Sequence, residues 1–230
     1  MKYTIIATGY NCEQYVSECI ESIINQTVDS WELFVYDDGS TDNTYKIAKR
    51  YANNKIHIIR NEINEGGLKG RYHIINNLAK GDVICLIGLD DSLTLDALEV
   101  LDKYYTDDVL MTWGSWMDSA GNHNIATNYD DEVWRTKNFR RSSWKATSLN
   151  TFKRSLISKV DKKFLMRDGK WMTNCTDLAY SFPCLEMIEK HNARVITNHI
   201  YNYRTNNPNN TLKRFGKQNK TSNREYLKTL

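Results

Sequence analysis

Two pairs of aspartates stand where carboxylates could do chemistry. Each pair comes after an apolar run: Asp37 and Asp38 directly follow residues 32–36, and Asp90 and Asp91 follow residues 83–87 after Gly88 and Leu89. Two carboxylates at the end of a strand can hold Mg²⁺ or Mn²⁺, because these ions prefer oxygen ligands and complete their shell with phosphate oxygens. Such aspartates can also cap the next helix. The first pair therefore indicates either a ligand pocket at the strand ends or a helix start, and the second pair indicates either a metal and phosphate site or a helix start.

The apolar pattern around the first pair predicts a βαβα unit. Residues 3–8 form a short apolar run, and apolar side chains at helical spacing follow over residues 16–24. Residues 32–36 are again strand-like, and residues 45–51 predict a second helix. Ligands of open parallel sheets bind outside the carboxyl ends of the strands. In this chain those ends carry Thr8, Gly9, Tyr10, Asp37 and Asp38.

The same alternation continues along the chain. It predicts strands over residues 55–59 and 83–87 and helices ending near Leu78 and covering residues 95–105 and 178–190. A glycine-bearing loop, residues 61–71, precedes the helix that ends near Leu78. Glycines there let backbone approach a ligand, and Arg71 could face a phosphate, although a solvated turn is the simpler interpretation. With 230 residues and 40% hydrophobic content, we expect one domain.

Three motifs together resemble the start of family 2 glycosyltransferases of the GT-A fold: TGYN at residues 8–11, IESIINQT at residues 20–27 and VYDDGSTDNT at residues 35–44. The resemblance implies a single α/β domain with a Rossmann-like, mostly parallel central sheet flanked by helices. It implies that Thr8 and Tyr10 line the nucleotide pocket and that Asp38 hydrogen-bonds the base, commonly uracil. Arg71 matches, by position, an arginine near the nucleotide.

The second aspartate pair falls on the metal motif of that family, which commonly reads Asp-x-Asp-Asp. Gly88 stands here where the first aspartate usually is. The resemblance assigns Asp91 to Mn²⁺ or Mg²⁺, and Asp90 to the ribose or to a shared metal position.

A third carboxylate could act as the base. An inverting transfer needs one carboxylate to take the proton of the acceptor hydroxyl, and the family usually carries Glu-Asp or Thr-Asp at the start of a helix for this. Thr176 and Asp177 match the second form, so Asp177 is the expected base, with helix capping as the alternative role and Asp168 as the rival base. Downstream, Arg204, Lys213 and Arg214 are expected to neutralise the departing diphosphate in a lid, or else to be surface cations.

The charge distribution bears on the acceptor. The chain has a net charge of +3, yet residues 134–172 carry twelve Lys and Arg against two Asp, interleaved with aromatic residues. We expect this segment on the acceptor side, with Trp144 and Trp171 as acceptor contacts. Three acceptors stay open: a glycan or glycolipid, a polyprenyl-phosphate-linked or teichoic-type chain, and nucleic acid with a hydroxylated base. The glycan leads by family frequency.

The expected organisation is a GT-A domain over residues 1–210, with a nucleotide-sugar half (1–105), an acceptor half (106–210) and a basic tail or lid (211–230). The lack of a long apolar run or leader predicts no integral membrane association, and five cysteines without CxxC spacing favour a reducing, cytoplasmic setting. Two other readings remain. A nucleotidyltransferase would need a glycine-rich loop with lysine after the first strand, which is lacking here; an inactive nucleotide- or glycan-binding module is favoured only by Gly88.

Overall fold

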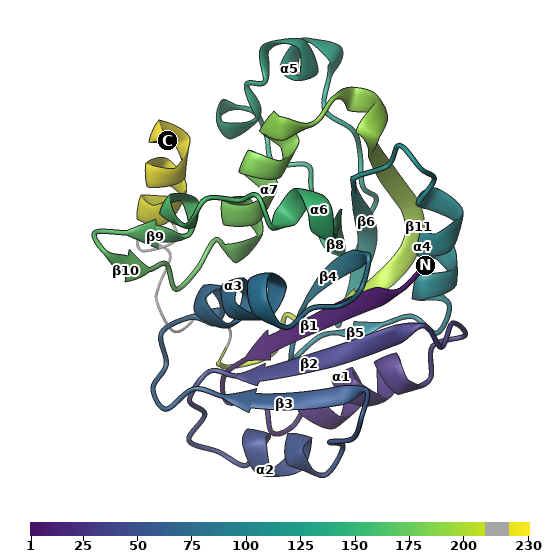
Figure 1. Cartoon of the computed structure of the whole chain (residues 1–230), viewed down its shortest axis with the longest axis vertical. Coiled ribbons are helices and arrows are strands. Elements are labelled where there is room, and N and C mark those ends of the chain that lie inside the picture. Colours follow the sequence, from purple (N-terminus) through teal and green to yellow (C-terminus); the bar gives the residue numbers. More distant parts are fainter. Residues whose placement is uncertain (210–220) are drawn as a thin grey trace.

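The computed structural model describes residues 1–209 and 221–230, and these residues form an α/β fold around one mixed sheet (Figure 1). The strands of this sheet run in the order β3-β2-β1-β4-β8-β6-β11-β5, and β7 pairs with β6. Their bounds are β1 Tyr3–Gly9, β2 Trp31–Asp37, β3 Ile56–Arg60, β4 Val83–Gly88, β5 Ser92–Leu93, β6 Met111–Asp118, β7 His123–Asn124, β8 Asn150–Lys153 and β11 Ala193–Tyr203. A separate hairpin consists of β9 (Met166–Arg167) and β10 (Lys170–Trp171).

The α-helices lie on both faces of this sheet (Figure 1). They are α1 Val16–Ile24, α2 Thr44–Lys49, α3 Gly67–Asn77, α4 Ala97–Tyr104, α5 Asp131–Thr136, α6 Arg154–Ile157 and α7 Thr176–Met187. Short 3₁₀ turns cover η1 Phe139–Arg141, η2 Lys162–Leu165 and η3 Lys190–Asn192, and residues 221–229 form a last helix. The predicted strands and helices of the first 105 residues are confirmed, with ends that differ by at most two residues.

Strands β1 to β4 are parallel, and the side chains of β1, β2 and β4 are buried on both faces, whereas those of the edge strand β3 are mostly half-buried. In β1, Ile5 packs with α1 and α4, whereas the next residue, Ile6, packs with α3 and α7. Each strand of such a sheet is covered on both sides, which is why it reads as a continuous apolar run. The run ends where the polar residues of the strand ends begin.

The second half of the chain continues the same sheet in a different sense. Strand β8 runs antiparallel between β4 and β6, with Asn150 opposite Leu86 of β4. Strand β11 then runs parallel to β6, and its far end pairs with β5. As a result, strands from both predicted halves end at the same edge of the sheet: β4 from the first half and β11 from the second.

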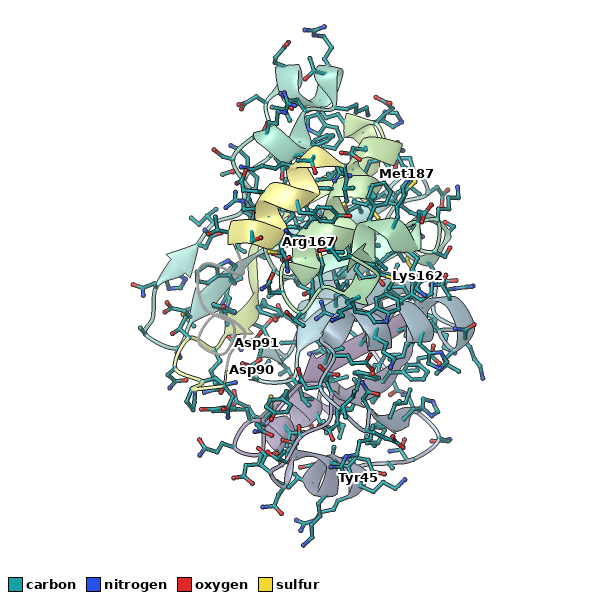
Figure 2. The ribbon with its side chains drawn as sticks, turned by 90° about the vertical axis from the view of Figure 1, so that its left-hand side faces the viewer. Tyr45, Asp90, Asp91, Lys162, Arg167 and Met187 are labelled. Carbon is teal, nitrogen blue, oxygen red and sulfur yellow. The ribbon has the colours of Figure 1, made fainter. Side chains whose placement is uncertain are left out.

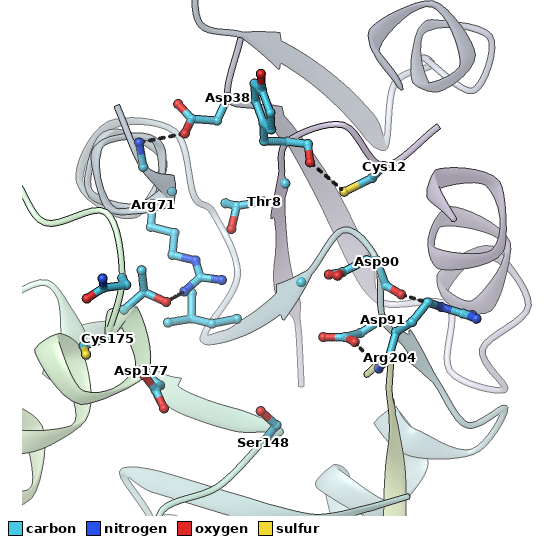
Figure 3. Close-up of a pocket in the computed structure, with 18 of the residues that line it drawn as sticks. Thr8, Cys12, Asp38, Arg71, Asp90, Asp91, Ser148, Cys175, Asp177 and Arg204 are labelled. Atoms are coloured by element: carbon cyan, nitrogen blue, oxygen red, sulfur yellow. Dashed lines mark hydrogen bonds between the residues drawn. The ribbon is translucent and has the colours of Figure 1, made fainter. Parts of the chain in front are cut away.

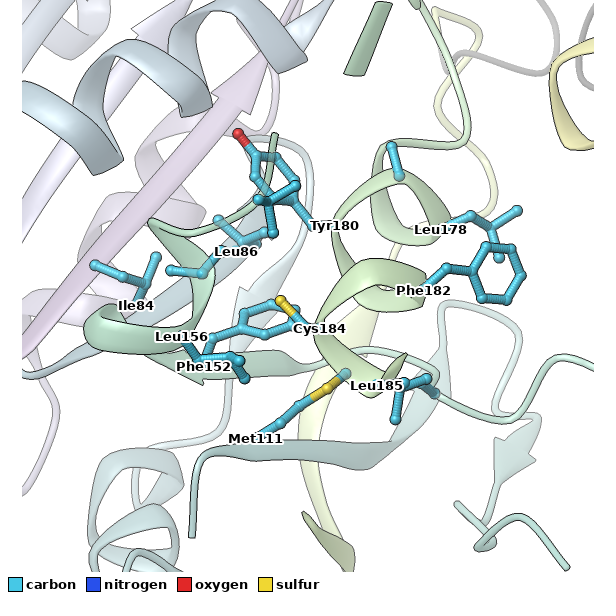
Figure 4. Packing of buried hydrophobic residues seen from close by; sticks show 14 of the residues in the cluster. Ile84, Leu86, Met111, Phe152, Leu156, Leu178, Tyr180, Phe182, Cys184 and Leu185 are labelled. Carbon is cyan, nitrogen blue, oxygen red and sulfur yellow. The ribbon is translucent and has the colours of Figure 1, made fainter. Parts of the chain in front are cut away.

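Helix α7 holds the second half against the sheet. Its apolar side chains interdigitate with those of β4, β6, β8 and α6 (Figure 4). The residues of this cluster on α7 are Leu178, Ala179, Tyr180, Phe182, Cys184 and Leu185. Burial of large apolar side chains of this kind contributes roughly 1.5–3 kcal/mol each, so the start of α7 is fixed relative to β4.

The predicted basic tail is described only in part. Lys213 and Arg214 lie outside the described residues, whereas residues 221–229 form a helix whose Leu227 is fully buried against the α7 side of the core. Arg140 donates to the carbonyl oxygen of Leu227 at 2.6 Å. Among the helices of the described residues, none combines the length and the apolar character needed to cross a bilayer.

Candidate active site

A cavity of about 290 Å³ opens at the carboxyl ends of β1, β2 and β4 and reaches the start of α7 (Figure 3). Both halves of the chain line it. Its polar lining comprises Thr8, Asp38, Arg71, Asp90, Asp91, Ser148, Asn150, Thr176, Asp177, Ser181, Tyr201, Arg204 and Asn207, among others. In the perpendicular view, Asp90 and Asp91 lie between the first half, marked by Tyr45, and the second half, marked by Lys162 and Arg167 (Figure 2).

The two aspartates after β2 have different surroundings. Asp37 is fully buried, accepts from the Ser40 backbone N–H at 3.1 Å and pairs with Arg60 at 3.3 Å, so it belongs to the turn. Asp38 lines the cavity instead. Its two carboxylate oxygens accept from the backbone N–H groups of Glu65 (3.2 Å) and Gly66 (2.7 Å). Asp38 therefore ties the end of β2 to the loop before α3 and does not cap α2.

The glycines of that loop are required by close approach. Gly66 has φ +91°, which favours glycine. A Cβ at Gly67 would stand 2.9 Å from the hydroxyl oxygen of Thr8. Consequently the amino terminus of α3 borders the cavity beside Thr8 and Asp38, where backbone N–H groups can approach a ligand phosphate.

Arg71 reaches across the cavity from α3. Its guanidinium donates to the Thr176 hydroxyl at 2.8 Å and to the carbonyl oxygen of Ile87 at 3.3 Å. Burial lowers the pKa of Arg71, while Tyr180, Tyr201, Asp177 and Asp91 act in the opposite direction. Arg71 thus lies between the predicted base and the predicted metal carboxylate, and it links the end of β4 to the start of α7.

The second aspartate pair is held by residues near the end of β11. Asp91 accepts from the Tyr201 hydroxyl at 2.5 Å and from the Arg204 backbone N–H at 2.7 Å. Asp90 accepts from the Asn207 side-chain amide at 2.7 Å. Helix α4 begins several residues later, with Asp96 at its N-cap position, so neither carboxylate caps it.

Burial raises the pKa of Asp91 well above its ordinary value, and the charge of Asp90 raises it further. Burial also raises the pKa of Asp90, against the Asn207 hydrogen bond and Arg204. Gly88 lies close to both carboxylates: a Cβ at this position would stand 2.6 Å from an oxygen of Asp91 and 2.8 Å from an oxygen of Asp90. Gly88 therefore leaves room for both carboxylates to converge on one point.

This donor set fits a divalent cation. The pKa values of the two converging carboxylates are raised, so a nearby cation would stabilise their charged forms. Mg²⁺ or Mn²⁺ is typically held by one or two carboxylates plus substrate phosphates. Among the described residues no group of three or more His, Cys, Asp or Glu side chains is arranged to hold a metal by itself. The fit therefore depends on a ligand that brings its own oxygens.

Arg204, predicted to contact the diphosphate, is anchored beside this pair. Its Nε donates to the Asp90 carbonyl oxygen at 3.0 Å, and its guanidinium pairs with Glu18 at 2.5 Å and covers the Tyr15 ring. Sequence reasoning assigned no role to Tyr201 or Asn207. Tyr201 lies three residues before Arg204, in the run YNYR at residues 201–204, and this short aromatic and basic run was the available signal.

Asp177 lies in the first turn of α7 and lines the cavity, with its side chain pointing into the same space as Ser148 (Figure 3). The rival base, Asp168, does not line the cavity. It lies in the turn between β9 and β10, where its carboxylate is 90% exposed and pairs with Arg167 at 3.6 Å. The geometry therefore favours Asp177 over Asp168.

The two tryptophans predicted to contact the acceptor lie outside the cavity lining. Trp144 is half-buried and packs edge-on against Phe182, with 5.4 Å between ring centroids. Trp171 packs against Tyr72 at 5.6 Å and is covered by Lys162. Their acceptor role stays a prediction. The polar residues at this end of the cavity that sequence reasoning missed are Ser148, Asn150 and Ser181.

Sequence comparison finds relatives whose matches cover from 39% to 93% of this chain. The model of "Glycosyl transferase family 2" matches residues 4–165. Glycosyltransferase GlyA of Streptococcus pneumoniae is 28% identical over 72% of this chain and 25% of its own length. The putative glycosyltransferase EpsE of Bacillus subtilis is 40% identical over 39% of this chain and 33% of its length. An uncharacterized glycosyltransferase of Methanocaldococcus jannaschii is 29% identical over 93% of this chain and 74% of its length.

Solved structures show the same fold. TarS of S. aureus in complex with UDP-GlcNAc superposes with a TM-score of 0.67 at 18% identity, covering 90% of this chain and 59% of that one. The UDP complex of TarS gives 0.66 and 19%. The chain thus spans a quarter to a third of GlyA and EpsE and about 60% of the TarS fragment. Since the family model matches more than half of the chain and the fold agrees, the predicted GT-A fold is confirmed and the chain belongs to glycosyl transferase family 2.

Proposed function

We propose that this chain transfers a sugar, with inversion, from a UDP-sugar to a hydroxyl group of a glycan or glycoconjugate, with Mn²⁺ or Mg²⁺ as cofactor. The observation that carries the proposal is the meeting of Asp38, Asp90, Asp91 and Asp177 in one cavity at the strand ends. The TarS complexes with UDP and UDP-GlcNAc support a UDP-sugar donor.

Asp38, Thr8 and Tyr10 would bind the nucleotide. The carboxylate of Asp38 accepts from the backbone N–H groups of Glu65 and Gly66 and from the Asn61 side-chain amide, and a carboxylate in the cavity is the kind of acceptor that suits the N–H of a base. The start of α3 and Arg71 lie next to it and would face the diphosphate. A buried guanidinium and a helix amino terminus both favour bound anions.

Asp91 and Asp90 would hold the divalent ion, which when bound supplies positive charge to the diphosphate leaving group. Asn207 and Tyr201 orient these two carboxylates from β11 and the segment after it. Arg204 lies against the same pair and adds a fixed cation.

Asp177 would take the proton of the acceptor hydroxyl. As the oxygen attacks the anomeric carbon, its new C–O bond forms while the bond from that carbon to the diphosphate oxygen breaks on the opposite side. The bonding electrons leave with UDP, and the proton stays on Asp177. General bases of this kind contribute typically 10²–10⁴-fold to the rate.

The acceptor assignment rests on the family and on chemistry near Asp177. The aromatic side chains interleaved with the cations of residues 134–172 are mostly used for packing: Trp134, Phe139 and Phe152 are buried. This weakens the nucleic-acid alternative, which relied on exposed rings for stacking bases. One relative is a poly(ribitol-phosphate) beta-glucosyltransferase, 32% identical over 43% of this chain, so a phosphate-linked polyol chain belongs in the acceptor test.

The first experiment measures UDP binding by calorimetry with and without Mn²⁺, and then UDP release from UDP-glucose and UDP-GlcNAc. The acceptors to be compared are oligosaccharides, poly(ribitol phosphate) and DNA containing 5-hydroxymethylcytosine. We expect Asp177→Asn to slow acceptor-dependent UDP release by about 10³-fold, with UDP affinity unchanged. The matched control is Asp168→Asn, which removes the rival carboxylate.

Three results would overturn parts of this proposal. Loss of turnover in Asp168→Asn but not in Asp177→Asn would reassign the base. Turnover with hydroxymethylated DNA alone would move the acceptor to nucleic acid. If no nucleotide diphosphate binds at all, the alternative of an inactive binding module would replace the proposed transferase.

A further inference from the structure

One buried polar side chain in the cavity lacks a protein partner for its donor. Asn150, at the start of β8, is 4% exposed and lines the cavity. Its Oδ1 lies 3.5 Å from the Ser181 hydroxyl, which is fully buried. Within the part of the chain that the structure describes, no hydrogen bond uses the Nδ2 of Asn150. Because Asn150 lines the cavity and its Nδ2 is not among the enclosed atoms, a group bound in the cavity can accept from this donor.

The surroundings of Asn150 are otherwise apolar. Leu86 of β4 is its neighbour in the sheet, and Phe152 follows it on the same strand; both line the cavity. Ser148 lies two residues earlier, and its side chain points into the same space as Asp177 (Figure 3). Ligand sites commonly combine such an apolar floor with a few placed polar groups that fix the orientation of the ligand.

The position of this polar group within the cavity identifies its ligand. In the proposed reaction the anomeric carbon must lie between the diphosphate on Asp90 and Asp91 and the acceptor oxygen on Asp177. Asn150 lies beside the last residues of β4, which lead into Asp90 and Asp91, and it contacts Ser181, one helical turn after Asp177. The group that fills the space between these two ends is the transferred sugar.

We infer that Asn150, with Ser148 beside it, binds a hydroxyl group of the transferred sugar and helps to select the donor; the inference rests on the proposed function. Asn150 Nδ2 would donate to that hydroxyl oxygen. Ser181 fixes the amide from behind, because its hydroxyl donates to Oδ1 and leaves Nδ2 directed to the cavity.

The test separates the sugar from the nucleotide. Calorimetry with Mn²⁺ measures Kd for UDP, UDP-glucose, UDP-galactose, UDP-GlcNAc and UDP-xylose with the wild type, Asn150→Ala, Asn150→Ser and Ser148→Ala. The matched control is Asn198→Ala, an exposed asparagine outside the cavity. We expect Asn150→Ala to weaken the best UDP-sugar about fivefold to tenfold while the Kd of UDP stays unchanged. Thermal melting of each variant checks that it folds, and Asn150→Ser serves if Asn150→Ala does not.

The inference would be overturned if Asn150→Ala changed the Kd of UDP and the Kd of the UDP-sugars equally, or changed neither. In the first case the side chain would serve the fold, and in the second it would not contact the donor. So would a wild type that binds no UDP-sugar more tightly than UDP. A wild type that binds no UDP at all would overturn the proposed function first, and the inference with it. Loss of discrimination among the five donors in Asn150→Ala would support a role in selection.

Discussion

Carboxylates are buried at both ends of the parallel strands, and the two ends treat them differently. At the amino end, Glu32 of β2 accepts from the Thr4 hydroxyl (2.6 Å) and from the backbone N–H groups of Lys80 (2.6 Å) and Gly81 (3.2 Å). Lys2 lies 3.9 Å from its second oxygen. The negative charge of Glu32 is thus met by groups of the protein itself.

At the carboxyl end, Asp91 has two donors, the Tyr201 hydroxyl and the Arg204 backbone N–H, and it faces the second carboxylate of Asp90. Its pKa is raised by burial and by that neighbour. Perturbed carboxylates in a cavity are typical of functional sites, whereas a fully hydrogen-bonded one is typical of a structural network. The contrast teaches that the protein leaves charge unbalanced where a ligand can balance it.

The substitution Asp91→Asn tests the carboxyl end of the parallel strands and should give the largest effect on turnover. Because Asp91→Asn removes one of the two converging carboxylates, we expect acceptor-dependent UDP release to fall by about 10²–10³-fold, comparable to the loss of one preorganised electrostatic group. The unfolding free energy without metal should not fall. Steady-state UDP release and urea unfolding in EDTA measure the two quantities. A variant that loses stability and keeps its turnover would place Asp91 with Glu32 as a structural group.

Removal of Glu32 is the reciprocal test at the amino end. Glu32→Ala leaves the Thr4 hydroxyl and the Lys80 backbone N–H without their acceptor, whereas the Gly81 N–H keeps the Thr4 hydroxyl oxygen at 2.9 Å, so we expect a loss of about 3 kcal/mol in unfolding free energy. For a chain of this size that lowers Tm by roughly 6–12 °C. UDP affinity should not change, since Glu32 does not line the cavity. Weaker UDP binding in a variant that melts normally would contradict the contrast between the two ends.

The same contrast explains how much the sequence alone could predict. Thr8 lies near the end of β1, Asp38 directly follows β2, and Asp90 and Asp91 come just after β4, so the local pattern was enough to place them at one edge of the sheet. Asp37 shows the limit even there: its neighbour faces the cavity, whereas its own side chain closes the turn with Ser40. Which member of a pair points to the ligand depends on backbone detail that spacing does not carry.

Contacts between distant segments could not be predicted. Tyr201 meets Asp91 across 110 residues, and Asn150 reaches the cavity only because β8 inserts antiparallel between β4 and β6. No periodicity signals such an insertion. Composition was also a poor guide to the acceptor region. A sequence does not distinguish an aromatic residue that packs against the core, as Trp144 does on Phe182, from one that is exposed to bind a sugar.

Titration gives the smallest and most specific test of the carboxyl end. The pKa of Asp91 in the folded protein lies above its ordinary value of 3.8, so the folded state binds a proton at pH values where the unfolded chain does not. The contribution of Asp91 to stability therefore rises as the pH falls through the raised pKa, and it is complete near the unfolded value. In EDTA, we expect the wild type to be less stable than Asp91→Asn at pH 8 and the difference to narrow steadily as the pH is lowered toward the unfolded value of 3.8. Mn²⁺ should stabilise the wild type more at pH 8 than at pH 5, because the ion and the proton compete for the same oxygens.

Urea unfolding across this pH range measures the difference in stability between the wild type and Asp91→Asn. The exposed Asp168→Asn is the control that should show no such difference. A difference that is constant with pH would mean that Asp91 is already balanced inside the protein, and the two ends of the sheet would then differ only in position.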